Sequence, residues 1–437
     1  MQINDKTNSQ GSISSGAMSR ILTGLLNPGG VLASSDNVVL LYDLALTEAR
    51  ISALKRVFPA GTLHAVAIKA NPLVKMLTKM QQAGAGAEAA SLPEIMLAQQ
   101  SGFAPEKIVF DSPAKTLGEL EYALKAGIML NADSFAELDR IAELLKTIES
   151  KSVIGLRINP QAGTGTIAST SVAGKVSKFG VPLDTNREKI IEYYLRYCWL
   201  KAIHVHIGSQ GCPVPLLVSG IRKVLDLCLQ IYDELQKAHL PAISVFDIGG
   251  GLPVSYHIGK KAVTADDYAA MLQTVCPELF TGTFRLITEF GRYTYANAGW
   301  VAAKVEYVKH EADHSIIVTH AGADMFLRKA YNPADWHHHI SVADSKGKLK
   351  TGNNTRKYIV AGPLCFGGDV IATDVDLPEV EEGDFLLIHD AGAYTLSMWS
   401  RYNSRQMPKV VAYNSTNDTV EILKERESAA ELIRFWS

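Results

Sequence analysis

Cysteine, net charge and long apolar runs are all scarce in this 437-residue sequence. Its five cysteines are widely spaced and include no Cys-x-x-Cys pair, which argues against a disulfide framework or a structural zinc site and for a reducing compartment. The 43 basic and 45 acidic residues leave a net charge of −2, so no basic surface for nucleic acid is expected. No apolar run is long enough to span a membrane, and the N-terminus lacks a hydrophobic signal core. We therefore expect a cytoplasmic protein that binds neither nucleic acid nor membrane.

The sequence does contain a repeating pattern of short apolar strand and amphipathic helix. Eight such strands, most followed by a helix, favour an α/β fold with a closed parallel (β/α)8 TIM barrel over an open doubly wound sheet. An open sheet usually has a glycine-rich turn after its first strand, whereas this one ends in Lys69-Ala70-Asn71-Pro72. The predicted strands are His64–Lys69, Ala85–Ala90, Lys107–Phe110, Ile128–Ala132, Val153–Ile158, Ala202–Ile207, Ser244–Ile248 and Arg285–Glu289.

The pattern changes near residue 290 and divides the chain into four expected parts. Residues 1–20, rich in Ser, Asn, Gln and Gly, are predicted to form a disordered tail. Residues 21–45 contain an early strand, Val38–Asp43, that is predicted to join the C-terminal domain because it precedes the barrel. Residues 46–290 form the barrel. Residues 291–437 are predicted to form an all-β domain, with strands at Ser315–Thr319, Lys357–Ala361, Asp384–His389, Lys409–Ala412 and Thr419–Leu423.

Candidate catalytic residues are found at the carboxyl ends of the predicted barrel strands, where such barrels place their active sites. They are Lys69, Glu88 with Ser91, Arg157, His206 with Ser209, Gly249-Gly250-Gly251, and Glu289 with Arg292. A strand-end lysine alone more often extends into solvent. A desolvated amine, however, attacks carbonyls to form a Schiff base, a glycine backbone can approach a phosphate, and a histidine and a carboxylate can contact a planar ring and its nitrogen. The set predicts pyridoxal 5'-phosphate as cofactor. Arg157 either pairs with a carboxylate inside the barrel or contacts substrate.

Seven short motifs carry a resemblance to a known family. They are Ala67-Ile68-Lys69-Ala70-Asn71, Ser177-Lys178-Phe179-Gly180, His206-Ile207-Gly208-Ser209-Gln210, Asp247-Ile248-Gly249-Gly250-Gly251, Glu289-Phe290-Gly291-Arg292, Gly362-Pro363-Leu364-Cys365 and Gly392-Ala393-Tyr394. In this order the sequence resembles the fold-type III pyridoxal-phosphate decarboxylases, which act on diaminopimelate, ornithine or arginine and share an alanine-racemase-like barrel. The His206–Gln210 motif is most similar to the diaminopimelate branch.

The resemblance implies roles for the matched residues. Lys69 would hold the cofactor as a Schiff base, His206 would stack on its ring, and Glu289 would pair with the ring nitrogen so that the ring accepts electrons when carbon dioxide leaves. Cys365, from the opposing subunit of a homodimer, would protonate the carbanion. The implied cofactor contacts are Lys69, His206, Ser209, Gly249, Gly250, Gly251, Glu289, Gly291, Arg292 and Tyr394, with Ser209, Gly250, Gly251 and Tyr394 on the phosphate.

The substrate side departs from the diaminopimelate pattern. Phe366 follows Cys365 where those enzymes have a glutamate that contacts the substrate's distal amino acid centre. The family's Arg-Pro-Ala-Leu-Tyr segment appears as Arg328-Lys329-Ala330-Tyr331, so Arg328 matches and Tyr331 is one place out of register. With Trp336-His337-His338-His339 nearby, these changes favour the branch that decarboxylates amino acid conjugates in siderophore assembly, such as citryl-diaminopropionate. The predicted substrate contacts are Arg292, Arg328, Tyr331, Phe366 and Tyr394.

Several alternative functions stay open. Diaminopimelate decarboxylation in lysine biosynthesis is the nearest, followed by an amino acid racemase on the same fold. Such racemases place an arginine at the pyridine nitrogen, so Glu289 favours decarboxylation. A non-catalytic relative is expected to lose Lys69 or Cys365, and neither is lost. His337 to His339 suggest a metal site, but consecutive residues in an extended segment point to alternating faces, and no metal is predicted.

Overall fold

The computed structural model describes residues 11–258, 260–311, 314–352 and 354–437. The chain divides into two compact units. The barrel unit consists of Glu48–Pro253 and Val263–Thr294. The β unit consists of the described residues up to Thr47 together with Val254–Ala262 and Tyr295–Ser437.

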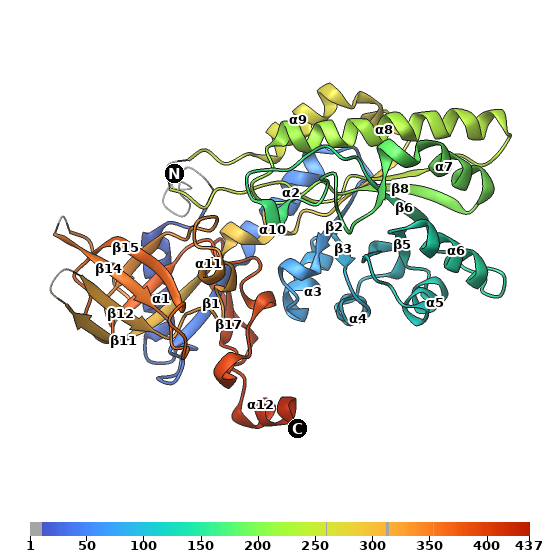
Figure 1. The fold of residues 1–437 in the computed structure, drawn as a ribbon. Helices are drawn as coiled ribbons and strands as arrows, with labels where there is room; N and C mark the ends of the chain where they lie inside the picture. The colour runs from blue at the N-terminus through green and yellow to red at the C-terminus, as the bar shows by residue number, and fades with distance from the viewer. Residues whose placement is uncertain (1–10, 259, 312–313, 353) are drawn as a thin grey trace. The chain divides into compact units, whose positions relative to one another are not determined.

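Eight parallel strands close into a barrel, as the sequence predicted (Figure 1). Each strand pairs with its neighbours along the chain, and the ring closes where Thr288 of the last strand pairs with His64 of the first. A two-residue strand, β7 (Val181–Pro182), pairs in addition with the fifth barrel strand. The barrel strands are β2 (Leu63–Ala67), β3 (Gly86–Ala89), β4 (Ile108–Asp111), β5 (Met129–Ala132), β6 (Ile154–Asn159), β8 (Leu200–Val205), β9 (Val245–Asp247) and β10 (Arg285–Thr288).

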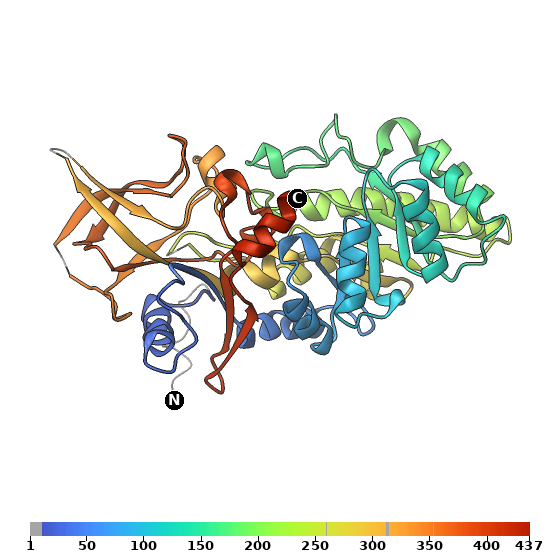
Figure 2. The same cartoon turned by 90° about the horizontal axis from the view of Figure 1, so that it is seen from below.

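Helices connect the strands and lie outside the ring (Figures 1 and 2). Ser91, Thr116, Ser134 and Thr264 each cap a helix by accepting a hydrogen bond from the backbone N–H three residues later. The α-helices are α2 (Leu44–Val57), α3 (Val74–Gln82), α4 (Leu92–Gln100), α5 (Leu117–Ala126), α6 (Phe135–Leu144), α7 (Leu183–Arg196), α8 (Val214–Lys237) and α9 (Ala265–Val275). The short 3-10 helices are η1 (Ile68–Ala70), η2 (Pro105–Lys107), η3 (Ala168–Thr170) and η4 (Pro277–Phe280).

The interior of the barrel changes from apolar to polar along the strands. A buried apolar cluster forms near their amino ends, with members such as Leu63, Val109 and Val245. The buried residues towards their carboxyl ends are ionisable or polar, namely Glu88, Asp111, Asn131, Arg157, His204, Asp247 and Thr288. Buried polar side chains need partners or a ligand, so the carboxyl end of the barrel is the place to look for a site.

Nine strands form the mixed sheet of the β unit. β1 (Val38–Asp43) lies between β11 and β17, antiparallel to the first and parallel to the second. The sheet runs in the order β15-β14-β12-β11-β1-β17-β18, while β16 pairs with β11 and β13. The other strands are β11 (Gly299–His310), β12 (Ser315–Thr319), β13 (Ile340–Ala343), β14 (Thr355–Ala361), β15 (Val370–Pro378), β16 (Phe385–Ile388), β17 (Lys409–Asn414) and β18 (Thr419–Lys424).

The predicted disordered tail is wrong for residues 15–20, because α1 (Ser15–Leu26) begins there. Ser14 caps this helix by accepting a hydrogen bond from the Ala17 N–H. Its apolar face, including Met18 and Leu22, is buried in the same core as Trp300 of β11. Residues 1–10 of the predicted tail lie outside the described residues. Because α1 packs on the sheet, the unit is β-rich rather than all-β. Other helices near or in this unit are α10 (Gly291–Tyr295), η5 (Ala296–Ala298), α11 (Leu327–Tyr331), η6 (Leu396–Met398), η7 (Tyr402–Ser404) and α12 (Ala429–Trp436).

The predicted continuous barrel over residues 46–290 needs one correction. Val254–Ala262 belongs to the β unit, because the rings of Tyr256 and His257 pack against Trp336 and His337. The segment therefore belongs to the β unit by its contacts, although barrel residues precede and follow it in the chain. Separately, none of the helices in the described part of the chain combines the length and apolar character needed to cross a membrane.

Candidate active site

Lys69 lies in the 3-10 turn that follows β2, not on the strand itself as predicted. Its Nζ donates to both carboxylate oxygens of Glu88 on β3, at 2.7 and 2.6 Å. Glu88 is fully buried, while the Lys69 side chain is 42% exposed. Burial raises the pKa of Glu88, and the adjacent Lys69 ammonium opposes that rise. The pair therefore holds an accessible amine next to a carboxylate that readily accepts its proton.

Glu289 is a buried carboxylate with one oxygen, Oε1, that the described residues leave without a hydrogen bond. Its Oε2 is 3.6 Å from His206 Nδ1 and its Oε1 is 3.8 Å from His204 Nε2. Among the described residues, Oε1 has no hydrogen-bond partner. Burial raises the pKa of Glu289 well above that of an ordinary glutamate, and the nearby carboxylates of Asp247 and Glu88 raise it further. A buried oxygen without a hydrogen-bond partner, such as Oε1, is expected to have one in the working protein.

His206 follows β8 and is oriented by the backbone. Its Nδ1 accepts a hydrogen bond of 3.0 Å from the Gly250 N–H. Burial lowers the pKa of His206, and the positive charges of Arg157 and Lys69 lower it further. The ring is therefore neutral and carries its proton on Nε2.

The glycine triplet forms a tight turn that leaves no room for side chains. Gly249 and Gly251 have φ values of +67° and +111°, which disfavour residues with a Cβ. A Cβ on Gly250 would lie 2.8 Å from the Glu289 carbonyl oxygen. Two of the three amides have acceptors within the protein, because Gly249 N–H donates to Asp247 Oδ1 and Gly250 N–H donates to His206. Gly251 N–H has no protein acceptor among the described residues.

The segment from Glu289 to Arg292 packs directly against the Lys69 turn. A Cβ on Gly291 would lie 2.9 Å from the Cβ atoms of both Ala67 and Ala70, so only glycine allows this approach. Arg292 is buried, and its Nε donates to Ser209 Oγ at 3.3 Å. Lys69, Glu289, Arg292 and Ser209 are thus brought together, as the sequence predicted for the mouth of the barrel.

Arg157 pairs with carboxylates inside the barrel, which decides between the two interpretations left open by the sequence. Its guanidinium is 3.5 Å from Asp111 and 4.0 Å from Asp133, and it stacks on the Phe179 ring at 4.6 Å. Burial raises the pKa of Asp133 to about 6, although Arg157 opposes the rise. Arg157 therefore balances charge beneath the mouth.

Sequence reasoning missed His204. It lies two residues before His206, and residues spaced by two on a strand share a face, so the His-Val-His pattern could have revealed it. Burial lowers the pKa of His204 to about 3. One ligand atom each from His204, His206 and Glu289 lie within 4.8 Å of one another. This spacing also suits a metal ion, so the geometry alone allows either a metal or the nitrogen of a ring at this point.

The predicted residues of the β unit form two groups of their own. Cys365 is exposed on a loop, where its N–H donates to Asn403 Oδ1 at 2.7 Å. The loop is held by buried Asp369, which accepts hydrogen bonds of 2.6 Å from the N–H groups of Leu364 and Ala323. Next to Cys365, the Phe366 ring stacks on exposed Tyr331 at 6.0 Å.

Arg328 forms the second group with aromatic rings. Its guanidinium lies 4.3 Å from the Tyr394 ring centre and 4.8 Å from that of Trp336. The following histidines have separate partners: His337 stacks on His257 at 4.7 Å, and His338 Nδ1 is 2.8 Å from the His389 carbonyl oxygen.

Comparison with known proteins identifies relatives along nearly the whole chain. The model of the family described as "Pyridoxal-dependent decarboxylase, pyridoxal binding domain" matches residues 44–296. Diaminopimelate decarboxylase of Aquifex aeolicus is 31% identical over 393 residues, covering 89% of each chain. That of Helicobacter pylori strain J99 is 32% identical over 404 residues, covering 90% of this chain and 94% of the relative. The crystal structure of H. pylori diaminopimelate decarboxylase complexed with L-lysine superposes with a TM-score of 0.80 at 29% identity, over 92% of this chain and 97% of that chain.

Proposed function

The chain belongs to the pyridoxal-dependent decarboxylase family, and on that premise we propose which substrate it takes and which residues act on it. It is a pyridoxal 5'-phosphate-dependent amino acid decarboxylase, a carboxy-lyase. Bound pyridoxal phosphate supplies an acceptor for the electron pair left on the α-carbon when carbon dioxide departs. The barrel residues fit this cofactor, because Glu289 has a buried oxygen that finds no donor among the described residues and the glycine turn brings backbone close to the site.

We assign the amine chemistry to Lys69 and its proton to Glu88. Attack on a carbonyl requires a neutral amine. Glu88 lies 2.7 Å from Lys69 Nζ and is fully buried, so the carboxyl group favours its neutral form and can take the proton. The same carboxyl group can return the proton when product leaves.

Glu289 and His206 are proposed to hold the ring. Glu289 Oε1, which has no donor in the described part of the chain, would accept a hydrogen bond from the protonated ring nitrogen, and that positive charge would in turn keep the carboxylate ionised. His206, fixed by the Gly250 N–H, would stack on the ring face. Arg292 Nε donates to Ser209 Oγ beside them. The proposed phosphate contacts are Ser209, Gly251, Arg292 and Tyr394.

A homodimer with shared sites is part of the proposal. Cys365 is exposed while its own N–H and that of Leu364 are hydrogen-bonded, which suits a residue that reaches into the site of a second copy. There the Cys365 thiol would deliver a proton to the substrate carbon after carbon dioxide has left.

meso-Diaminopimelate is the first substrate candidate. The observation that supports it is the full-length similarity to diaminopimelate decarboxylases, at 31% identity over 89% of both chains for the A. aeolicus enzyme. This similarity favours diaminopimelate over the siderophore precursor that the sequence alone suggested.

A second candidate, an amino acid conjugate with a distal carboxylate, is favoured by the residue after Cys365. Phe366 stacks on Tyr331 and contacts the edge of Tyr402 at 6.0 Å, so this position offers aromatic surface and no carboxylate for a distal ammonium group. Arg328, lying between two aromatic rings, offers positive charge instead.

A carbon dioxide release assay separates the two candidates. The panel consists of meso-diaminopimelate, lysine, ornithine and citryl-diaminopropionate, each compared by kcat/KM. The highest value for diaminopimelate is the expected result. A higher value for the citrate conjugate would replace the first candidate with the second, and no carbon dioxide from any α-amino acid would contradict both.

A further inference from the structure

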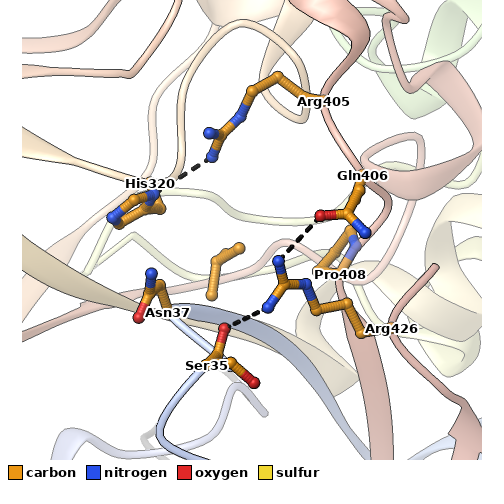
Figure 3. A pocket seen from close by; sticks show the side chains of 8 residues that line it. Ser35, Asn37, His320, Arg405, Gln406, Pro408 and Arg426 are labelled. Carbon is orange, nitrogen blue, oxygen red and sulfur yellow. Dashed lines mark hydrogen bonds between the residues drawn. The ribbon is translucent and has the colours of Figure 1, made fainter. Parts of the chain in front are cut away.

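A cavity of about 160 Å³ lies within the β unit, on a part of the chain to which neither the catalytic proposal nor the sequence motifs assign a role (Figure 3). Four chain segments build it: the start of β1 with the residues just before it, the residue after β12, the residues before β17 and the residues after β18. Its lining residues are Ser35, Asn37, Val38, His320, Arg405, Gln406, Pro408 and Arg426. The lining is therefore mostly polar and includes two arginines and no carboxylate.

Arg426 lines the cavity, and its guanidinium donates two hydrogen bonds to neighbouring residues. It donates from Nη1 to the Ser35 carbonyl oxygen at 2.5 Å and from Nη2 to Gln406 Oε1 at 2.9 Å. Both acceptors are neutral, and in the described part of the chain Arg426 forms no ion pair with a carboxylate. A guanidinium has five N–H donors, so Arg426, an exposed residue that lines the cavity, keeps further donors for a ligand there.

Arg405 adds a second guanidinium from another side (Figure 3). Its Nη2 donates to His320 Nδ1 at 3.2 Å. Its Nε is buried and has no hydrogen-bond partner among the described residues, with the nearest carboxylate oxygen, Asp324 Oδ2, 3.7 Å away. Buried donors of this kind are rare in proteins unless a ligand or water satisfies them.

The acidic groups nearby contact the arginine and the histidine but do not line the cavity. His320 accepts from Arg405 at Nδ1 and therefore donates from Nε2 to Glu306, 3.0 Å away. Asp324 is fully buried, and burial raises its pKa to about 6 although Arg405 opposes the rise. A ligand in the cavity would thus meet donors and positive charge first.

We propose that this cavity binds a small oxyanion, a tetrahedral phosphate or sulfate or the carboxylate of a small organic acid, between Arg405 and Arg426. Two guanidiniums offer bidentate hydrogen bonds to such groups, which is the geometry that arginine provides best. The volume is well above the roughly 10–15 Å³ that a single water needs on this measure, so there is room for an ion of four or five heavy atoms. The site belongs to the β unit and does not depend on the proposed catalytic roles.

Equilibrium dialysis with radiolabelled inorganic phosphate tests the proposal. The protein is the holoenzyme after borohydride reduction, so that the cofactor's phosphate cannot exchange, and chloride keeps the ionic strength constant. The expected result is one saturable phosphate per chain, bound at least tenfold more weakly by Arg405→Gln and by Arg426→Gln. Arg434→Gln, which removes an exposed arginine of the same unit, is the matched control and should bind as the wild type does.

Labelled succinate in a parallel series distinguishes the two ligand sources. Saturable binding of phosphate, with displacement by sulfate, assigns a tetrahedral anion, whereas binding of succinate alone assigns a carboxylate. Arg426→Lys keeps the charge and loses the planar fork, so it should bind several-fold more weakly even if Arg405→Gln folds poorly. No saturable binding of either probe, or equal binding by wild type and the Arg426 variants, would overturn the proposal.

Discussion

Replacing Glu289 by glutamine should lower activity and raise the stability of the cofactor-free enzyme at the same time. Glu289 is fully buried, and one of its oxygens has no donor among the described residues. In the proposed holoenzyme the carboxylate would pair with the protonated ring nitrogen, and a hydrogen bond to a charged group contributes about 1.5–3 kcal/mol. Since 1.36 kcal/mol is a factor of ten in rate, kcat should fall roughly 10- to 150-fold in Glu289→Gln while the cofactor remains bound.

The stability of the cofactor-free enzyme should change with pH in a defined direction. The folded pKa of Glu289 is raised above its unfolded value, which is near 4.3. Between these two values the unfolded chain has released a proton that the folded chain still binds, so the wild type loses stability as pH rises through this window. Glutamine cannot titrate. The variant's advantage should therefore be small near pH 4.5 and grow by about 1.4 kcal/mol per pH unit within the window.

The change in stability is measured by thermal unfolding of the cofactor-free wild type and Glu289→Gln from pH 5 to 8. The change in kcat is measured by single-turnover carbon dioxide release by the two holoenzymes. Each kcal/mol gained should raise the unfolding temperature of the barrel unit by about 2–4 °C. Glu48→Gln, at an exposed position of α2, controls for the loss of a carboxylate and should change neither quantity. Parallel stability curves together with an unchanged kcat would refute the role given to Glu289.

Three further predictions concern other parts of the proposed site. Lys69→Ala should abolish covalent cofactor attachment and nearly all turnover while circular dichroism stays unchanged, since its side chain is 42% exposed and packs little; normal turnover would contradict the assignment. Mixing Lys69→Ala with Cys365→Ala subunits should restore about a quarter of wild-type activity, because half of the dimers are mixed and each mixed dimer has one complete site. Confirmed mixed dimers without activity would argue against shared sites. If the natural substrate is a carboxylate conjugate, Phe366→Glu should raise kcat/KM for meso-diaminopimelate about 10- to 100-fold, because the new carboxylate adds a charge-assisted hydrogen bond. A decrease in kcat/KM would show that the aromatic contact between Phe366 and Tyr331 serves diaminopimelate itself.

The barrel could be predicted from the sequence because most of its strands are short, largely apolar and followed by an amphipathic helix. That pattern is local, and it also located Lys69, His206 and Glu289, since parallel strands end at the same mouth. α1 was missed because its Ser- and Gly-containing start resembles a disordered tail, whereas in the structure its apolar face is buried in a core shared with Trp300. Such long-range contacts are not encoded in any window of sequence.

The finer chemistry of the site was less predictable for the same reason. That Gly250 donates to His206 depends on how β8 and β9 lie side by side. The ion pair between Lys69 and Glu88 depends likewise on the register of β2 and β3. The sequence motifs identify the residues of the site, but the hydrogen bonds between them depend on strand pairing.

The position of β1 between β11 and β17 has a consequence for the protein during synthesis. Val39 pairs with Lys409, so this strand emerges from the ribosome about 370 residues before its parallel partner. At roughly 5–20 residues per second, that interval is on the order of 20–70 s. The apolar sequence Val-Val-Leu-Leu-Tyr has both edges unpaired until β11 is made, and the edge that faces β17 stays unpaired throughout the interval. A strand in that state readily pairs with other chains. The sheet of the β unit can therefore be completed only after translation of the barrel has ended.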